Sequence, residues 1–304
     1  MSRHTSFIAG CAVVFLLAGC GVSDAQLTDD DVASESGELG TTSRTYVVFR
    51  HDMRRCASPM CGGWFVHDVN RASVREVYVP GFDFTGSGLT EEQQQVVTSG
   101  GNFEVVLYGK LGALKNGYRD FVVSSAWRGL PGVTFTEGKD SFFRASNVSI
   151  QCITAPCPSM KASKLHSTST TLFHDLTVER ASKPFVDQNW LVSRITDRDA
   201  LVAGVVRDGA QVGAGVEKVL DATQVFLKIP DALGPCGRPA LPLCASPRVN
   251  TFVRDTNRCT FAGSCVKPGV CAQFVPACAE GYSLQQWTGG PNACPQYACD
   301  PSFL

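Results

Sequence analysis

The sequence lacks an excess of charge of either sign. It carries 27 Lys and Arg against 28 Asp and Glu in 304 residues, which gives a formal net charge of −1. A protein whose main partner is nucleic acid needs a concentrated basic surface, so this balance argues against that partner. The hydrophobic fraction of 44% is ordinary for a globular protein and excludes a chain that is disordered throughout.

The motifs of common enzyme classes are also missing. The chain has no G-x-S-x-G elbow, no H-E-x-x-H zinc motif and no glycine-rich phosphate-binding loop of the G-x-x-x-x-G-K-[ST] or G-x-G-x-x-G type. Histidines are few. We expect His67 at the surface of a strand, and we interpret His174 beside Asp175 as a chance neighbour rather than a catalytic base. The sequence therefore predicts a protein that is not an enzyme and holds no cofactor and no metal.

No apolar run is long enough to span a membrane. Residues 7–19 carry no charge, but they fall short of the ~20 residues that a helix needs to cross a bilayer. Because Arg3 and His4 precede this run, the pattern is typical of an export signal over residues 1–19 that is cleaved from the mature chain.

The end of that run, Leu17-Ala18-Gly19-Cys20, resembles the lipobox of bacterial lipoproteins. The resemblance implies cleavage before Cys20, attachment of lipid to its sulfur, and anchoring in a membrane through the acyl chains. Gly21 stands where an aspartate would indicate retention in the inner membrane, so the outer membrane is favoured. The alternative is a plain secretory signal with an incidental cysteine.

Residues 20–43 contain six acidic residues and no basic ones, together with many Ser, Thr and Gly. Such a composition buries too little apolar surface to fold. We interpret this stretch as a flexible acidic tether between the lipid anchor and a folded body.

The body contains an internal repeat. Residues 56–61 and 152–157 are both C-x4-C sequences with an internal proline, 96 residues apart. Flanking segments match at nearly the same offset: residues 48–50 with 142–144, 76–78 with 171–173, and 104–109 with 201–206. We therefore expect two tandem units, over residues 44–137 and 138–233.

Each unit combines strands with one helix. Alternating apolar residues predict strands in the first unit, at residues 45–50, 63–69, 74–79, 102–111 and 121–128. A capping box at Thr90 predicts a helix that stops at Gly100, and the second unit has its helix near residues 187–194. The expected fold class is α+β and rich in β-structure: two tandem antiparallel-sheet units, each with one helix, followed by a small disulfide-rich C-terminal module over residues 234–304.

Fourteen cysteines indicate an oxidising compartment. We expect the two C-x4-C pairs to form disulfides, whereas the alternative, a metal site shared by both pairs, would more often use C-x2-C spacing. In the C-terminal module disulfides must replace a core. The twelve cysteines predicted to form disulfides are Cys56, Cys61, Cys152, Cys157, Cys236, Cys244, Cys259, Cys265, Cys271, Cys278, Cys294 and Cys299. The pairing of the last eight stays open.

Two sets of residues carry a resemblance over residues 45–230. They are residues 55–65 with Val69-Asn70, and residues 152–157 with Lys164-Leu165. In these stretches the chain resembles an uncharacterised family of secreted proteins and lipoproteins of the myxobacterial type. The resemblance supports the arrangement of domains and implies no activity.

Two functions remain open. The first is a non-catalytic, lipid-anchored protein of the cell envelope that binds a protein or a polysaccharide at the cell surface. We expect Trp287, in a predicted loop, to be exposed on that binding surface. The second is a proteinase inhibitor that presents a disulfide-closed loop at residues 54–61 or 281–294, because a pre-organised loop loses little entropy on binding.

Overall fold

The computed structural model describes residues 43–71, 75–197, 199–231, 235–237, 243–271, 273–288 and 293–304. The predicted signal segment, Cys20 and the tether up to residue 42 lie outside the described residues. Within the described ranges, no helix is both long enough and apolar enough to cross a membrane.

The body consists of two halves with the same order of elements. The first half contains β1 (Thr45–His51), β2 (Trp64–Asp68), β3 (Val77–Val79), β4 (Phe82–Asp83), α2 (Glu91–Thr98), β5 (Val105–Leu111) and β6 (Phe121–Gly129). The second half contains β7 (Ser141–Asn147), β8 (Met160–Lys164), β9 (Thr170–Phe173), β10 (Asp175–Thr177), α3 (Gln188–Asp197), β11 (Leu201–Val212) and β12 (Gly215–Ile229). The predicted α+β, β-rich class is confirmed. Strands β4 and β10 were not predicted, because two or three residues are too few to show a period.

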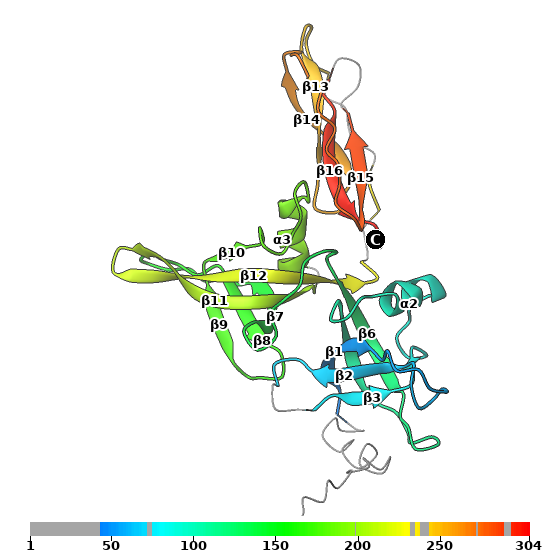
Figure 1. Cartoon of the computed structure of the whole chain (residues 1–304). Helices are drawn as coiled ribbons and strands as arrows, with labels where there is room; N and C mark the ends of the chain where they lie inside the picture. Colours follow the sequence, from blue (N-terminus) through cyan, green and yellow to red (C-terminus); the bar gives the residue numbers. More distant parts are fainter. Residues whose placement is uncertain are drawn as a thin grey trace, which may run out of the picture.

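All twelve of these strands belong to one sheet, in the order β3-β2-β1-β5-β6-β12-β11-β7-β8-β9, with β4 beside β6 and β10 beside β12. Read outward from the antiparallel β6–β12 pair, both sides of this order are the same. The short strands repeat the relation, since β4 is parallel to β6 and β10 is parallel to β12. A pseudo-two-fold axis therefore passes between β6 and β12, and the halves share one continuous sheet (Figure 1).

Strand pairing corrects the residue matches between the halves. The sequence comparison matched Val48 with Phe142. The pairing of β1 with β5 and of β7 with β11 shows instead that Tyr46 in β1 is equivalent to Phe142 in β7. That match was two residues out of register. The error has a simple cause: a strand alternates with a period of two, so a shift of two preserves the pattern of apolar residues.

Two glycines mark the correct register. Gly109 in β5 and Gly204 in β11 each lie at a β-bulge. A Cβ atom at Gly109 would lie 2.0 Å from the Val122 carbonyl oxygen, and one at Gly204 would lie 2.2 Å from the Asp221 carbonyl oxygen. Because the neighbouring strand approaches too closely for any side chain, glycine is required at both bulges.

The two helices are capped by side chains. The Thr90 hydroxyl accepts from the Gln93 backbone N–H, and the Gln93 side-chain oxygen accepts from the Thr90 N–H, which confirms the predicted capping box of α2. At the start of α3, the Asp187 carboxylate accepts from the Trp190 N–H at 3.1 Å. Helix α3 buries four side chains, whereas α2 buries only Val97.

Three apolar clusters stabilise the body. One lies between α2 and the first half of the sheet and includes Val97 and Phe121. A second lies between α3 and the second half and includes Trp190 and Phe173. The third joins the halves, with Trp127 of β6 packed among residues of β1, β7 and β11. The halves are thus connected by a core as well as by the β6–β12 hydrogen bonds.

The C-terminal module consists of two hairpins, formed by β13 (Val249–Arg254) with β14 (Thr260–Val266) and by β15 (Tyr282–Trp287) with β16 (Gln296–Pro301). The expectation of disulfides is confirmed. Both C-x4-C sequences close on themselves. In the module the pairs are Cys236–Cys259, Cys244–Cys265, Cys271–Cys294 and Cys278–Cys299.

The module packs against the second half of the body (Figure 1). Buried Tyr282 and Cys299 belong to the same cluster as α3. The Tyr282 hydroxyl donates to the Pro131 carbonyl at 3.2 Å, and the Cys299 N–H donates to the Phe185 carbonyl at 2.9 Å. Burial raises the pKa of the Tyr282 phenol, so this group stays protonated as a donor.

Candidate functional site

A pair of symmetric contacts closes the junction between the halves. Asn70 follows β2 and His166 follows β8, and both have a left-handed backbone, with φ of 61° and 58°. The Asn70 side chain donates to the Phe142 carbonyl at 2.8 Å and accepts from the Phe142 N–H at 2.7 Å. In the mirrored contact, His166 Nε2 lies 3.0 Å from both the N and the O of Tyr46. Each half thus forms hydrogen bonds to the first strand of the other half, and we call this pair of contacts the clasp.

A cleft of about 570 Å³ opens beside the clasp. Its walls come from the end of β2, from the connector between β6 and β7, and from β8. We call it the seam cleft; its lining residues are His67, Asp68, Val69, Asn70, Arg71, Glu76, Phe135, Glu137, Gly138, Lys139, Asp140, Ser141, Phe142 and Lys164. Its volume is typical of a site for a small molecule or a short polymer segment.

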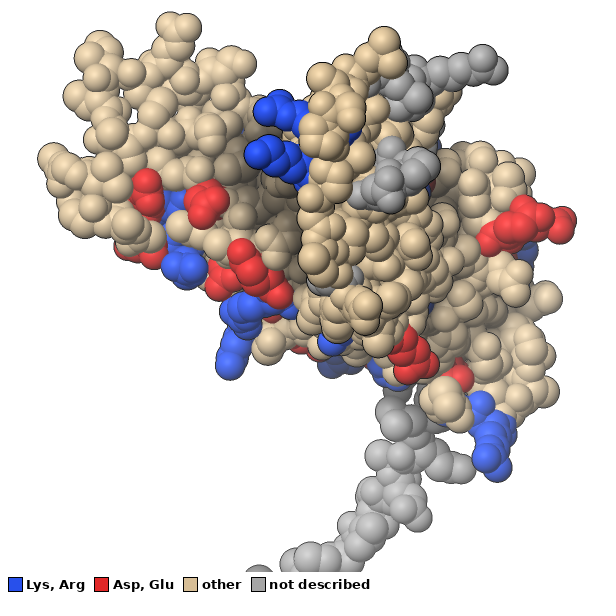
Figure 2. All heavy atoms as spheres, turned by 90° about the horizontal axis from the view of Figure 1, so that it is seen from above, with Lys and Arg blue, Asp and Glu red and all other residues tan. Residues whose placement is uncertain are grey.

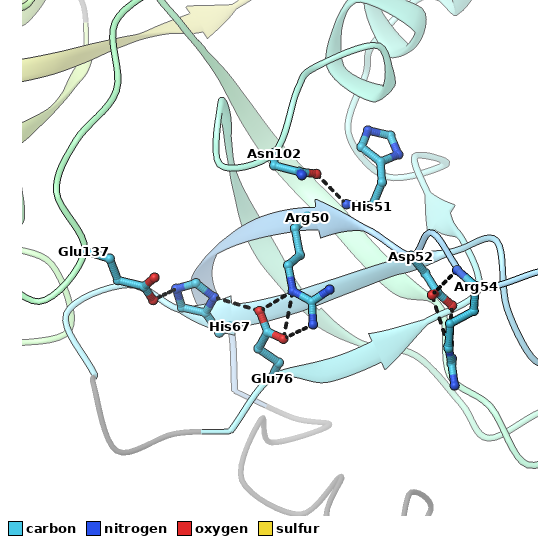
Figure 3. A network of polar contacts seen from close by, with 8 residues as sticks. All are labelled: Arg50, His51, Asp52, Arg54, His67, Glu76, Asn102 and Glu137. Atoms are coloured by element: carbon cyan, nitrogen blue, oxygen red, sulfur yellow. Dashed lines mark hydrogen bonds and ion pairs between the residues drawn. The ribbon is translucent and has the colours of Figure 1, made fainter.

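His67 stands between two carboxylates at the edge of the cleft. Its Nε2 lies 3.4 Å from Glu137 and its Nδ1 lies 3.9 Å from Glu76 (Figure 3). Arg50 holds Glu76 in place, because its Nε donates to the carboxylate at 2.9 Å. These hydrogen bonds raise the pKa of the Arg50 guanidinium. The expected exposure of His67 was wrong, since only 13% of its side chain reaches solvent.

Asp68 forms the buried polar part of the cleft. Its side chain is 1% exposed, accepts a hydrogen bond from the Thr45 hydroxyl at 2.5 Å, and lies 3.3 Å from Arg71 Nη1. The other acidic lining residues are half-buried or exposed, and the basic ones are Arg71, Lys139 and Lys164. Acidic and basic groups therefore alternate around the opening, so the cleft has no strong charge of one sign.

Two phenylalanines supply the apolar part. Phe135 and Phe142 meet edge to face, with ring centroids 4.8 Å apart. Phe142 is buried, while Phe135 is half-buried and extends the cluster that joins the halves into the cleft. A ligand in the cleft would thus meet hydrogen-bonding groups together with the half-exposed ring of Phe135.

A second polar group lies next to the Cys56–Cys61 disulfide. Arg54 Nε donates to Asp52 at 3.0 Å (Figure 3). Its Nη2 donates to the Met60 carbonyl at 3.1 Å. The hydrogen bonds from Arg54 lower the pKa of Asp52. The Tyr78 hydroxyl donates to the Pro59 carbonyl at 2.9 Å. These contacts fix the shape of an exposed loop over residues 53–60.

The sequence predicted that Trp287 lies in a loop, and this prediction was wrong. Trp287 is the last residue of β15 and is half-buried. Its indole N–H donates to the Phe252 carbonyl at 3.3 Å, and the Arg254 guanidinium lies 5.6 Å from its ring. Part of the second predicted inhibitor loop, residues 281–294, is likewise the paired strand β15.

Other candidate groups do not come together. His174 accepts from the Lys218 N–H at 2.8 Å, while Asp175 accepts from the Leu176 N–H, so neither orients the other. No cluster of three or more His, Cys, Asp or Glu among the described residues is placed to hold a metal ion. No pattern in the sequence indicated the seam cleft, since Phe135 and Glu137 come from a connector without periodicity.

Comparisons with known proteins agree with the boundaries of the body. Residues 45–232 match the family described as Domain of unknown function (DUF6748). The chain is 30% identical over 195 residues to an uncharacterized protein of Dictyostelium discoideum. That alignment covers 62% of this chain and 64% of the relative, so the chain spans less than two thirds of the relative's length. No solved structure matches.

Proposed function

The chain belongs to the DUF6748 family, and we propose that it is a non-catalytic, lipid-anchored protein of the cell envelope that binds a polysaccharide segment in the seam cleft. The observation that carries the proposal is the seam cleft itself, a polar opening of about 570 Å³ with a half-buried phenylalanine at its wall. The membrane anchor and the ligand rest on different residues and are argued separately below.

The anchor rests on Leu17-Ala18-Gly19-Cys20 and on the resemblance to secreted proteins and lipoproteins of the myxobacterial type. Lipid on Cys20 would hold the body at the outer membrane through the acidic tether. Mass spectrometry of the mature N-terminus tests this. We expect an acylated Cys20, and we expect Cys20→Ala to move the protein from the membrane fraction to the soluble fraction. An unmodified N-terminus would leave a plain secreted protein.

A sugar polymer suits the chemistry of the cleft. Carboxylates accept hydrogen bonds from sugar hydroxyls, ammonium groups donate to them, and amides do both. The Phe135 ring offers an apolar surface for a sugar face. The mixed charges favour a neutral ligand over a strongly charged one. The carboxylates already have partners, Glu76 with Arg50 and Asp68 with Thr45. Their engagement favours recognition over proton transfer.

The test uses the detergent-purified mature chain and soluble oligosaccharides released from envelope polysaccharide, with affinity measured by calorimetry. We expect Phe135→Ala to weaken binding about tenfold, the loss of one aromatic contact of 1–1.5 kcal/mol. Phe261→Ala is the matched control, because Phe261 is a half-exposed phenylalanine on β14, outside the cleft. Binding that both variants retain would move the ligand away from the seam cleft.

A second candidate function is proteinase inhibition. The specific observation is the loop over residues 53–60, which is exposed, closed by the Cys56–Cys61 disulfide and fixed by Arg54 and Tyr78. A loop of fixed shape can occupy a protease cleft with little entropic cost. Titration against serine, cysteine and metallo-proteases tests it. Stoichiometric inhibition that Arg55→Ala abolishes would support this candidate, whereas survival of every protease's activity would exclude it.

A further inference from the structure

Buried arginines gather where α3 meets the C-terminal module. Arg194 of α3 has a side chain only 2% exposed, and its Nε donates to Asp231 at 3.0 Å. Arg254 of β13 and Arg258 of the β13–β14 turn approach Asp300 of β16, with side chains 6% and 13% exposed. Three guanidinium groups therefore share two carboxylates in a region from which water is largely removed.

Trp190 connects the two sides of this cluster. The guanidinium carbons of Arg194 and Arg258 each lie 5.7 Å from the Trp190 ring. Arg258 also interacts electrostatically with Asp300, Asp231, Arg254 and Arg194, while burial lowers the pKa of its guanidinium. The groups thus form one electrostatic unit with an excess of one positive charge.

Four hydrogen-bond donors of this unit find no protein acceptor within the described ranges. They are Nη1 and Nη2 of Arg194, Nε of Arg258 and Nε1 of Trp190. Elsewhere among the described residues such donors occur one to a residue, on Trp64, His67, Arg119, Arg128 and Gln224. A buried donor without an acceptor destabilises the fold, and the penalty is larger when the donor is charged. Because all four are donors in a unit with an excess of one positive charge, an anion suits them better than a neutral acceptor.

We propose that the interface between α3 and the C-terminal module binds one monoatomic anion of the chloride type, held by Arg194, Arg258 and Trp190. The four nitrogen atoms are closed off from solvent, so the ion is enclosed as the module docks. A singly charged ion matches the excess of one positive charge, whereas a doubly charged sulfate or phosphate would exceed it. The ion balances the excess charge, and it joins the module to the body at a place where apolar contacts are interrupted by arginines.

Quenching of tryptophan fluorescence by iodide tests the proposal on the mature chain in detergent. An iodide ion beside Trp190 quenches that one residue and saturates, whereas quenching of exposed tryptophans rises linearly. We expect a saturable part in the wild type, absent in Trp190→Phe. Chloride at ten times its own dissociation constant should raise the half-saturating iodide concentration about tenfold. Phosphate and sulfate at the same ionic strength should compete far less.

Two matched variants separate binding from folding. Arg258→Lys keeps the charge but removes the Nε–H donor, and we expect it to weaken iodide binding about tenfold. Arg180→Lys is the control, because Arg180 is 66% exposed in an ion pair with Asp221, and it should leave the saturable part unchanged. Purely linear quenching in the wild type, or a saturable part that persists in Trp190→Phe, would overturn the proposal. Equal competition by phosphate would refute the monoatomic ion.

Discussion

The two halves of the body share one topology but differ in what is attached to it. The second half carries the C-terminal module on its helix α3, and its hairpin β11–β12 extends as a long arm (Figure 1). The corresponding β5–β6 hairpin is shorter. In Figure 2, charged side chains are scattered over the body around the C-terminal module, whereas the module, which faces the viewer, shows few of them. The two halves therefore differ in the elements attached to the sheet, while their strand order is the same.

The residues common to both halves are those that set backbone geometry. They are the bulge glycine, the left-handed residue after the second strand, the disulfide-closed loop and the side chain that caps the helix. The side chains at equivalent strand positions differ, as with Tyr46 and Phe142. The comparison indicates that backbone constraints preserve a duplicated sheet more strictly than the identity of its core residues.

The strongest test of equivalence is to add a side chain at the two bulges. Gly109→Val and Gly204→Val should each lower the free energy of unfolding by about 3 kcal/mol or more, since a Cβ would collide with backbone of the neighbouring strand. Urea unfolding with disulfides intact measures the effect. Gly86→Val is the control, because nothing lies within 4 Å of its position. A large loss at only one bulge would break the equivalence.

The clasp should show a smaller, unequal effect. Asn70→Ala removes three hydrogen bonds to backbone groups and should cost about 2 kcal/mol, while His166→Ala should cost about 1 kcal/mol because one nitrogen serves Tyr46. His166→Asn should retain most of the stability, since asparagine performs the same role in the first half. A result in which His166→Asn is as damaging as His166→Ala would show that the contacts are not interchangeable.

Removing the two helix caps should affect different lengths of helix. Thr90→Ala and Asp187→Ala should each cost about 1 kcal/mol. Hydrogen exchange should accelerate along all of α2 after Thr90→Ala, because Val97 is the one fully buried side chain of that helix. After Asp187→Ala, hydrogen exchange should accelerate only in the first turn of α3, because four buried side chains hold the helix as a whole against the sheet. Equal spread in both helices would contradict this account.

Acid should affect the first half more than the second. Arg54 lowers the pKa of Asp52, so the charged carboxylate stabilises the fold above its unfolded pKa of about 3.9, and this contribution disappears as the pH falls through the folded pKa. Asp52→Asn should therefore be less stable than the wild type at pH 7, by under about 1 kcal/mol, with the difference vanishing in acid. The equivalent residue of the second half is Val148, which does not titrate. A difference that is constant with pH would argue against the ion pair.

Much of the fold could be predicted from the sequence, because its main signals are local. Alternation predicted the strands, and the capping box at Thr90 predicted α2. Exact register could not be predicted, since a shift of two leaves the alternation unchanged. The seam cleft could not be predicted either. Asn70 and His166 are single residues whose role depends on a distant strand, and Phe135 belongs to a connector without a repeating pattern.

The pseudo-two-fold axis between β6 and β12 has a consequence for how the two halves are joined. A single half would expose residues 126–129 of β6 as an unpaired edge, which in a free protein invites association. Two identical copies paired through that edge would form an isologous dimer with the arrangement seen here. The chain thus has the arrangement of such a dimer within one polypeptide, and the connector over residues 130–140 joins the two halves covalently. Since that connector contributes Phe135 and Glu137 to the seam cleft, part of the cleft wall comes from the segment that makes the two halves one chain, and a dimer of separate halves would lack that part.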